Sequence, residues 1–96
     1  MLTGKQKRFL RSKAHHLNPI FQIGKNGVTP EVLHQITEAL EARELIKVNV
    51  LQNCEQTKEE IEAIFEQQPF EIVQKIGHIF VLYAESVDQK KLHLPE

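Results

Sequence analysis

A short loop with two glycines, within residues 23–30, has the residue types and spacing best suited to bind an anion. Gly24 and Gly27 bracket Lys25 and Asn26, which gives a G-x-x-G pattern directly after a short apolar run. Glycine has no Cβ, so this backbone can take a positive φ and approach a ligand closely. A close backbone beside a lysine ammonium would suit a phosphate group.

A helix is expected to start immediately after this loop. Thr29 is a good N-cap residue and Pro30 suits the first helical position. The free amides and the positive dipole end of that helix would then converge with Lys25 on one anion. Because G-x-x-G is also common as a plain turn between a strand and a helix, the local sequence leaves both a turn and a phosphate grip open.

Positive and negative charges are separated along the chain. Residues 1–30 hold six Lys and Arg and no Asp or Glu, whereas residues 31–96 hold the other six and all 13 acidic residues. A net charge of −1 therefore hides segments of +6 and −7. A basic face that binds a polyanion is favoured over a solvated basic helix. In addition to Lys25, the basic residues of this segment are Lys5, Lys7, Arg8, Arg11 and Lys13.

Apolar spacing predicts three helices and four strands. Helices are expected over residues 3–17, over residues 30–44, and from Thr57, in a capping box with Glu60, to a stop before Pro69. Strands are expected over residues 20–23, 45–51, 70–76 and 78–84, the last two joined by a hairpin at Gly77. The order α-β-α-β-α-β-β predicts an α/β fold, with a mixed four-stranded sheet covered by helices.

The apolar spacing also predicts which residues face the core and which face solvent. Leu17 is expected on the apolar side of the first helix, and Glu41 on the solvated acidic side of the second. The strand at residues 45–51 alternates, so its polar side is expected to be wet. The run at residues 79–83 is apolar on both faces and predicts an interior strand, and residues 86–96 are expected to be irregular.

Length and composition predict one domain over residues 1–96 in a reducing, cytoplasmic compartment. No apolar run approaches the roughly 18 residues of a membrane span, and the N-terminus lacks the apolar core of a signal peptide. One cysteine, Cys54, excludes an internal disulfide. The carboxylates line helix faces, and the adjacent His15 and His16 point in different directions, so no catalytic pair, metal site or cofactor is expected.

The chain resembles a known family over nearly its whole length. The matching residues are Gln6-Lys7, Leu10, Ala14-His15, Pro19, Ile23 to Thr29, Ala39-Leu40, Glu44 to Val48, Ile76-Gly77 and Val81 to Tyr83. In this combination they look like a bacterial CRM-domain protein of the YhbY type. Relatives often place an arginine after the Leu-Tyr pair, where this chain has Ala84, so a basic contact there is absent or moved.

The resemblance implies an RNA-binding domain that contacts precursors of the large ribosomal subunit during assembly. It also implies a fold similar to the C-terminal domain of translation initiation factor three. The implied RNA contacts are Gly24, Lys25, Asn26 and Gly27 in the loop and Lys5, Lys7, Arg8, Arg11 and Lys13 in the first helix.

The expected function is non-catalytic binding of ribosomal RNA through shape and phosphate contacts. The main alternative is a protein-interaction adaptor whose basic helix docks on a ribosomal protein or assembly factor. An enzyme is least favoured because no nucleophile with its base appears. The RNA hypothesis places the loop and the basic helix face side by side, with Lys25 and Arg8 or Arg11 on the same side. The sequence leaves the oligomeric state open.

Overall fold

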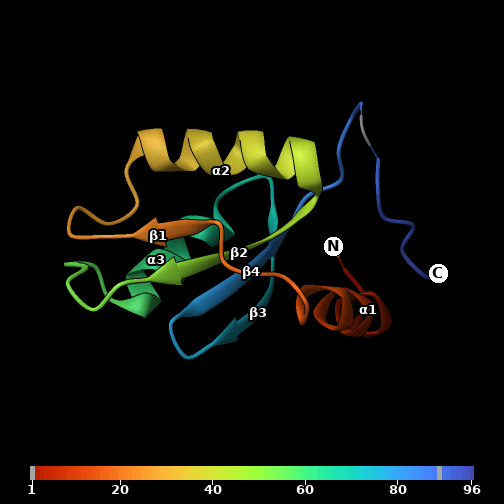
Figure 1. Cartoon of the computed structure of the whole chain (residues 1–96), viewed down its shortest axis with the longest axis horizontal. Coiled ribbons are helices and arrows are strands. Elements are labelled where there is room, and N and C mark those ends of the chain that lie inside the picture. Colours follow the sequence, from red (N-terminus) through yellow and green to blue (C-terminus); the bar gives the residue numbers. More distant parts are fainter. Residues whose placement is uncertain (1, 89) are drawn as a thin grey trace.

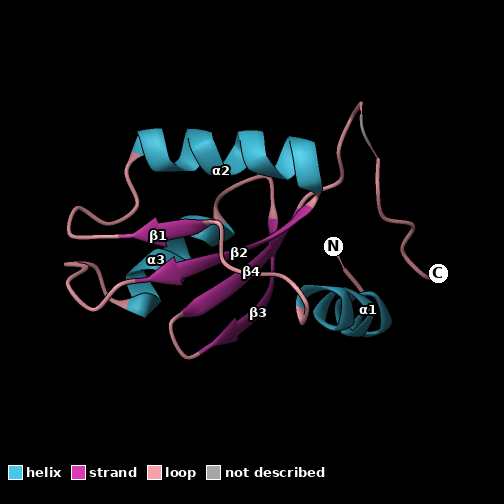
Figure 2. Cartoon of the chain, viewed as in Figure 1, coloured by secondary structure: helices cyan, strands magenta, loops and turns pink. Residues whose placement is uncertain are grey.

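The computed structural model describes residues 2–88 and 90–96, and its elements follow the expected order (Figure 2). The helices are α1 (Gly4–Ala14), α2 (Pro30–Arg43) and α3 (Lys58–Glu66). The strands are β1 (Phe21–Ile23), β2 (Leu45–Val50), β3 (Glu71–Ile76) and β4 (Ile79–Tyr83). No helix in the described part of the chain is long and apolar enough to cross a membrane.

The strands form one mixed sheet in the order β1-β2-β4-β3 (Figure 1). β1 and β2 are parallel, whereas β4 is antiparallel to both of its neighbours. Residues 80–83 of β4 are buried, which confirms the predicted interior strand. The hairpin between β3 and β4 turns at Gly77, whose φ of +56° favours glycine.

The helices cover the two faces of this sheet unequally. α2 and α3 cover one face with a core that includes Ile36, Leu40, Ile61, Phe65, Ile46, Val48, Phe80 and Leu82. α1 packs on the other face, where its Leu10 and Ala14 join a cluster with the strand residues Leu45, Val73, Val81 and Tyr83. Lys47 and Asn49 of β2 alternate with the core residues of their strand and are half-buried. The predicted wet side of this strand is therefore the part of the face that α1 leaves uncovered.

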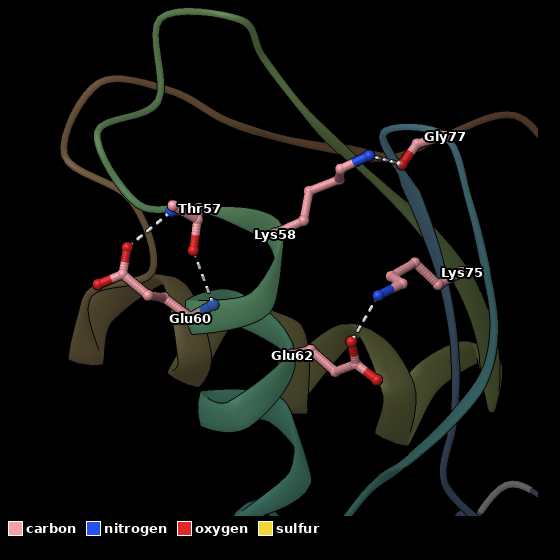
Figure 3. A network of polar contacts seen from close by, with 6 residues as sticks. All are labelled: Thr57, Lys58, Glu60, Glu62, Lys75 and Gly77. Carbon is pink, nitrogen blue, oxygen red and sulfur yellow. Dashed lines mark hydrogen bonds and ion pairs between the residues drawn. The ribbon is translucent and has the colours of Figure 1, made fainter.

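Threonine caps define where the helices begin. The Thr57 amide donates to Glu60 Oε1 at 2.8 Å, and the Glu60 amide donates to Thr57 Oγ1 at 3.1 Å (Figure 3). Thr3 and Gln6 form the same reciprocal pair at the start of α1. Thr29 accepts from the Val32 amide at the start of α2. These bonds satisfy amides that a helix start leaves without a partner, so the predicted capping box of α3 is confirmed.

α1 ends at Ala14, so the prediction that it continues to Leu17 is wrong. The Leu17 amide donates to the Ala14 carbonyl at 2.9 Å, which closes a tight turn, and the Leu17 side chain is 38% exposed. The sheet order explains the early end. α1 packs over β2 and β3, whereas β1 is the edge strand beyond β2, so the chain needs residues 15–20 to cross to that edge.

The C-terminal segment has no helix or strand in its described residues, as expected, but α2 holds it by two carboxylates. Glu44 is fully buried and accepts from the amides of Ser86, Lys91 and Leu92. Glu41 accepts from the Ser86 hydroxyl and from two amides of the same segment. The prediction that Glu41 belongs to a solvated outer face is therefore wrong, because the returning chain supplies donors to it.

These contacts change the acidity of both carboxyls. Burial raises the pKa of Glu44, but the amides of Ser86, Lys91 and Leu92 and the charge of Lys90 together hold that pKa below its ordinary value. The Ser86 hydroxyl and neighbouring amides lower the pKa of Glu41. A lowered folded-state pKa means that the ionised carboxylate stabilises the fold above the ordinary pKa of glutamate. This stabilisation is lost as the pH falls through the lowered value.

We expect Glu44→Gln to lower the free energy of unfolding at neutral pH by about 1 to 3 kcal/mol, because an NH₂ group then faces backbone donors. Urea unfolding at pH 7 and near pH 3 measures this, and the difference from wild type should shrink at the lower pH. Glu38→Gln is the matched control, because Glu38 lies on the exposed side of α2 beside His34. Equal stability of the two variants at pH 7 would contradict the role of Glu44.

Candidate nucleic-acid interface

The loop between β1 and α2 is a tight turn whose second glycine is required by the fold. The Gly27 amide donates to the Gly24 carbonyl at 3.0 Å, and Gly27 has a φ of +70°. A Cβ at Gly27 would lie 2.2 Å from Gln56 Oε1. A Cβ at Gly24 would meet only Leu51 Cδ1, at 4.0 Å. Gly27 therefore serves the conformation of the loop, while Gly24 leaves space beside the backbone.

Gln56, in the loop between β2 and α3, supports this turn from behind. Its Oε1 accepts from the Val28 amide at 2.7 Å, and the neighbouring Glu55 amide donates to the Lys25 carbonyl at 3.2 Å. These bonds hold the backbone of the loop while Lys25 and Asn26 remain exposed. Gln56 was not predicted from the sequence, because no local pattern relates it to a residue 28 positions away.

Part of the backbone that was expected to bind an anion at the start of α2 is already engaged within the fold. The amides of Gly27, Val28 and Val32 already donate to Gly24, Gln56 and Thr29, respectively. The depression beside the loop, about 370 Å³, is lined by Glu31 as well as by Lys25 and Asn26. Glu31 therefore places a negative charge beside the residues that were expected to bind an anion.

The basic residues expected in the site form no ion pairs with carboxylates in the described part of the chain. Within residues 2–88 and 90–96, no ion pair involves Lys5, Lys7, Arg8, Arg11, Lys13 or Lys25. Lys13 lies over the Phe9 ring, 5.5 Å from its centroid. By contrast, Lys75 pairs with Glu62 at 2.6 Å (Figure 3), and Lys90 pairs with Glu85 at 2.9 Å. Six cations without an ion pair thus lie on α1 and at the loop, and in the described residues Arg43, Lys47, Lys58 and Lys91 also form none.

The loop and α1 lie toward opposite ends of the long axis, with the sheet between them (Figure 1). In that view the loop after β1 is at the left and α1 is at the lower right. The hypothesis of two surfaces side by side is therefore not correct as stated. One ligand can reach both only by lying along the sheet.

His15 and His16 lie at the end of α1, with ring centroids 5.4 Å apart and nearly perpendicular planes. No group of three His, Cys, Asp or Glu in the described residues could hold a metal ion. The chemistry available to the candidate interface is therefore that of lysine, arginine, histidine and amide groups.

The fold and this charge distribution define a class, namely a small α/β domain with a mixed sheet and with cations on its first helix and on a glycine loop. The model of the CRS1 / YhbY (CRM) domain family matches residues 2–84. "Probable RNA-binding protein YqeI" of Bacillus subtilis is 62% identical over 96 residues, covering 99% of this chain and all of the relative. The chain belongs to the CRS1/YhbY (CRM) domain family.

Two further relatives agree with this assignment. An "RNA-binding protein" of Haemophilus influenzae is 47% identical over 95 residues, covering 98% of this chain and 95% of the relative. The solution structure of the hypothetical protein SAV1595 from Staphylococcus aureus, described as a candidate RNA-binding protein, has a TM-score of 0.78 and 53% identity. The alignment covers 99% of this chain and all of that one, and confirms the predicted α/β fold.

We expect Gly27→Ala to lower the free energy of unfolding by roughly 1 to 3 kcal/mol, because of its positive φ and the contact with Gln56. Gly24→Ala is the control and should change it by less than about 0.5 kcal/mol. Urea unfolding of both variants measures the difference. If Gly27→Ala proved as stable as wild type, the structural role of Gly27 would be refuted.

Proposed function

We propose that residues 1–96 act as one CRM-type RNA-binding domain that contacts ribosomal RNA during assembly of the large ribosomal subunit. The observation that carries this proposal is the set of uncompensated cations on α1 and at the loop. The relatives named as RNA-binding proteins, which match nearly the whole chain, support RNA as the polyanion.

The proposed contacts are to phosphates and do not require catalysis. Lys5, Lys7, Arg8, Arg11 and Lys13 would hold one part of the RNA, and Gly24, Lys25, Asn26 and Gly27 another. Lysine and arginine position an RNA backbone without identifying its bases. On the other side of the molecule, α3 carries Glu59 and Glu66, whose charges would repel RNA from that surface.

Precursor large-subunit RNA in the cytoplasm is the proposed target, and a ribosomal protein is the alternative partner. A salt series with protein-free precursor RNA separates the two. RNA affinity that falls steeply with salt supports the proposal, because bound cations release counterions from phosphates. Binding to a ribosomal protein alone, with no measurable affinity for the RNA, would replace the proposal with the adaptor function.

We expect Lys25→Ala to weaken binding similarly for different RNA sequences, since a phosphate contact carries no sequence information. The slope of log affinity against log salt should fall in magnitude by up to roughly 0.7 to 0.9. Lys75→Ala is the control, because it changes the net charge equally but removes a lysine that pairs with Glu62. Unchanged affinity and slope in Lys25→Ala would remove Lys25 from the interface.

A further inference from the structure

A groove of about 240 Å³ separates the end of α1 from the part of the sheet that α1 does not cover. Arg11 and His15 line it from the helix, and Lys47, Gln74, Ile76 and Ile79 line it from three strands. The strand register explains the arrangement, because Lys47 and Gln74 are both partners of Val81 and so lie in one row across β2, β4 and β3. No carboxylate is among the residues that line this groove.

Lys47 is the residue of this groove that most needs an explanation. It lies half-buried on a central strand and forms no ion pair in the described part of the chain. A bound phosphate would give the Lys47 ammonium an anionic partner in this groove. On the opposite face, Lys75 has such a partner in Glu62 (Figure 3). In the described residues, Lys47 is therefore a cation without an ion pair in a groove lined by no carboxylate.

The other residues of the groove add features that a phosphate alone would not need. Ile76 is 57% exposed and Ile79 is half-buried, so they present an apolar floor. The Gln74 side-chain amide offers both donors and an acceptor. An apolar floor beside an amide and two cations matches an unpaired nucleotide, whose base has an apolar face and polar edges and whose phosphate is anionic.

The groove also lies on the route between α1 and the loop. Leu51, four residues after Lys47 and about 13 Å further along the strand direction, donates its amide to the Ile23 carbonyl at the base of the loop. Asn49 and Gln22 are register partners between these points and lie on the same face as Lys47. A polar path therefore leads from the groove to the loop over the uncovered sheet face.

We propose that this groove binds an unpaired nucleotide of the RNA that spans α1 and the loop, with its phosphate at Arg11 and Lys47 and its base on Ile76, Ile79 and Gln74. This inference rests on the proposed RNA-binding function and adds a third contact region to it. It also explains how two separated surfaces serve one ligand, because the RNA strand crosses the sheet between them.

The test compares two model RNAs, a hairpin with a short single-stranded extension and the same hairpin with a blunt end. Wild type should bind the extended hairpin more tightly. Lys47→Met keeps the length of the side chain and removes its charge. We expect it to weaken binding of the extended hairpin about fivefold or more, to reduce the salt slope by roughly 0.7, and to leave the blunt hairpin unaffected.

Two further variants support the comparison. Lys75→Met is the matched control on the opposite sheet face and should bind both RNAs as wild type does. Ile76→Glu is a second test at an exposed position, where folding is not at risk, and its charge should weaken only the extended hairpin. Thermal unfolding of each variant verifies that it is folded.

The outcomes separate this inference from the function on which it rests. If wild type binds neither RNA, the proposed function fails and the groove inference fails with it. If Lys25→Ala weakens binding but Lys47→Met and Ile76→Glu do not, RNA binding stands and the groove is excluded. Equal weakening of both hairpins by Lys47→Met would also overturn the nucleotide assignment, because it would indicate a general phosphate contact.

Discussion

The packing of three helices against two sheet faces constrains the rest of this structure. α2 and α3 share one face, so α1 is the one described helix on the other. Its apolar residues Leu10 and Ala14 reach only the end that holds Leu45, Val81 and Tyr83. The rest of that face stays partly open to solvent, which suits the polar residues Lys47 and Asn49. The same packing places the most basic helix beside the open surface, while the acidic helices lie behind the sheet. The basic helix α1 and the acidic helices α2 and α3 therefore lie on different sides of the sheet.

Two side chains, Gln56 and Glu44, hold distant segments of the chain in place by hydrogen bonds to backbone amides. At one end, Gln56 binds the Val28 amide and holds the glycine loop while Lys25 stays exposed. At the other end, the buried Glu44 carboxylate binds the returning C-terminal chain, whose Leu92 and Leu94 pack beside α1. Both supports are polar side chains that bind backbone amides from distant segments. The backbone that carries Lys25 is therefore held by contacts within the chain.

The local sequence predicted much of this fold because the signals for its elements are local. Alternation in β2, apolar residues on both faces of β4, and the cap formed by Thr57 and Glu60 each depend on neighbouring residues only. The early end of α1 was not predictable in this way, because it follows from the position of β1 at the far sheet edge. The partners of Glu44 and Gln56 were missed for the same reason. Composition and spacing singled out the loop and α1 as candidates, but their separation and the proposed role of Lys47 required the strand order.

The most direct test of this account is to map the surface that RNA contacts. Amide chemical shifts of the isotope-labelled protein, followed by NMR while the extended hairpin is added, report every contacted region at once. The account predicts changes in α1, in the loop at residues 24–27, and on the sheet around Lys47 and Gln74, with little change along the exposed sides of α2 and α3. Changes confined to α2 and α3, or to α1 with none on the sheet, would contradict it.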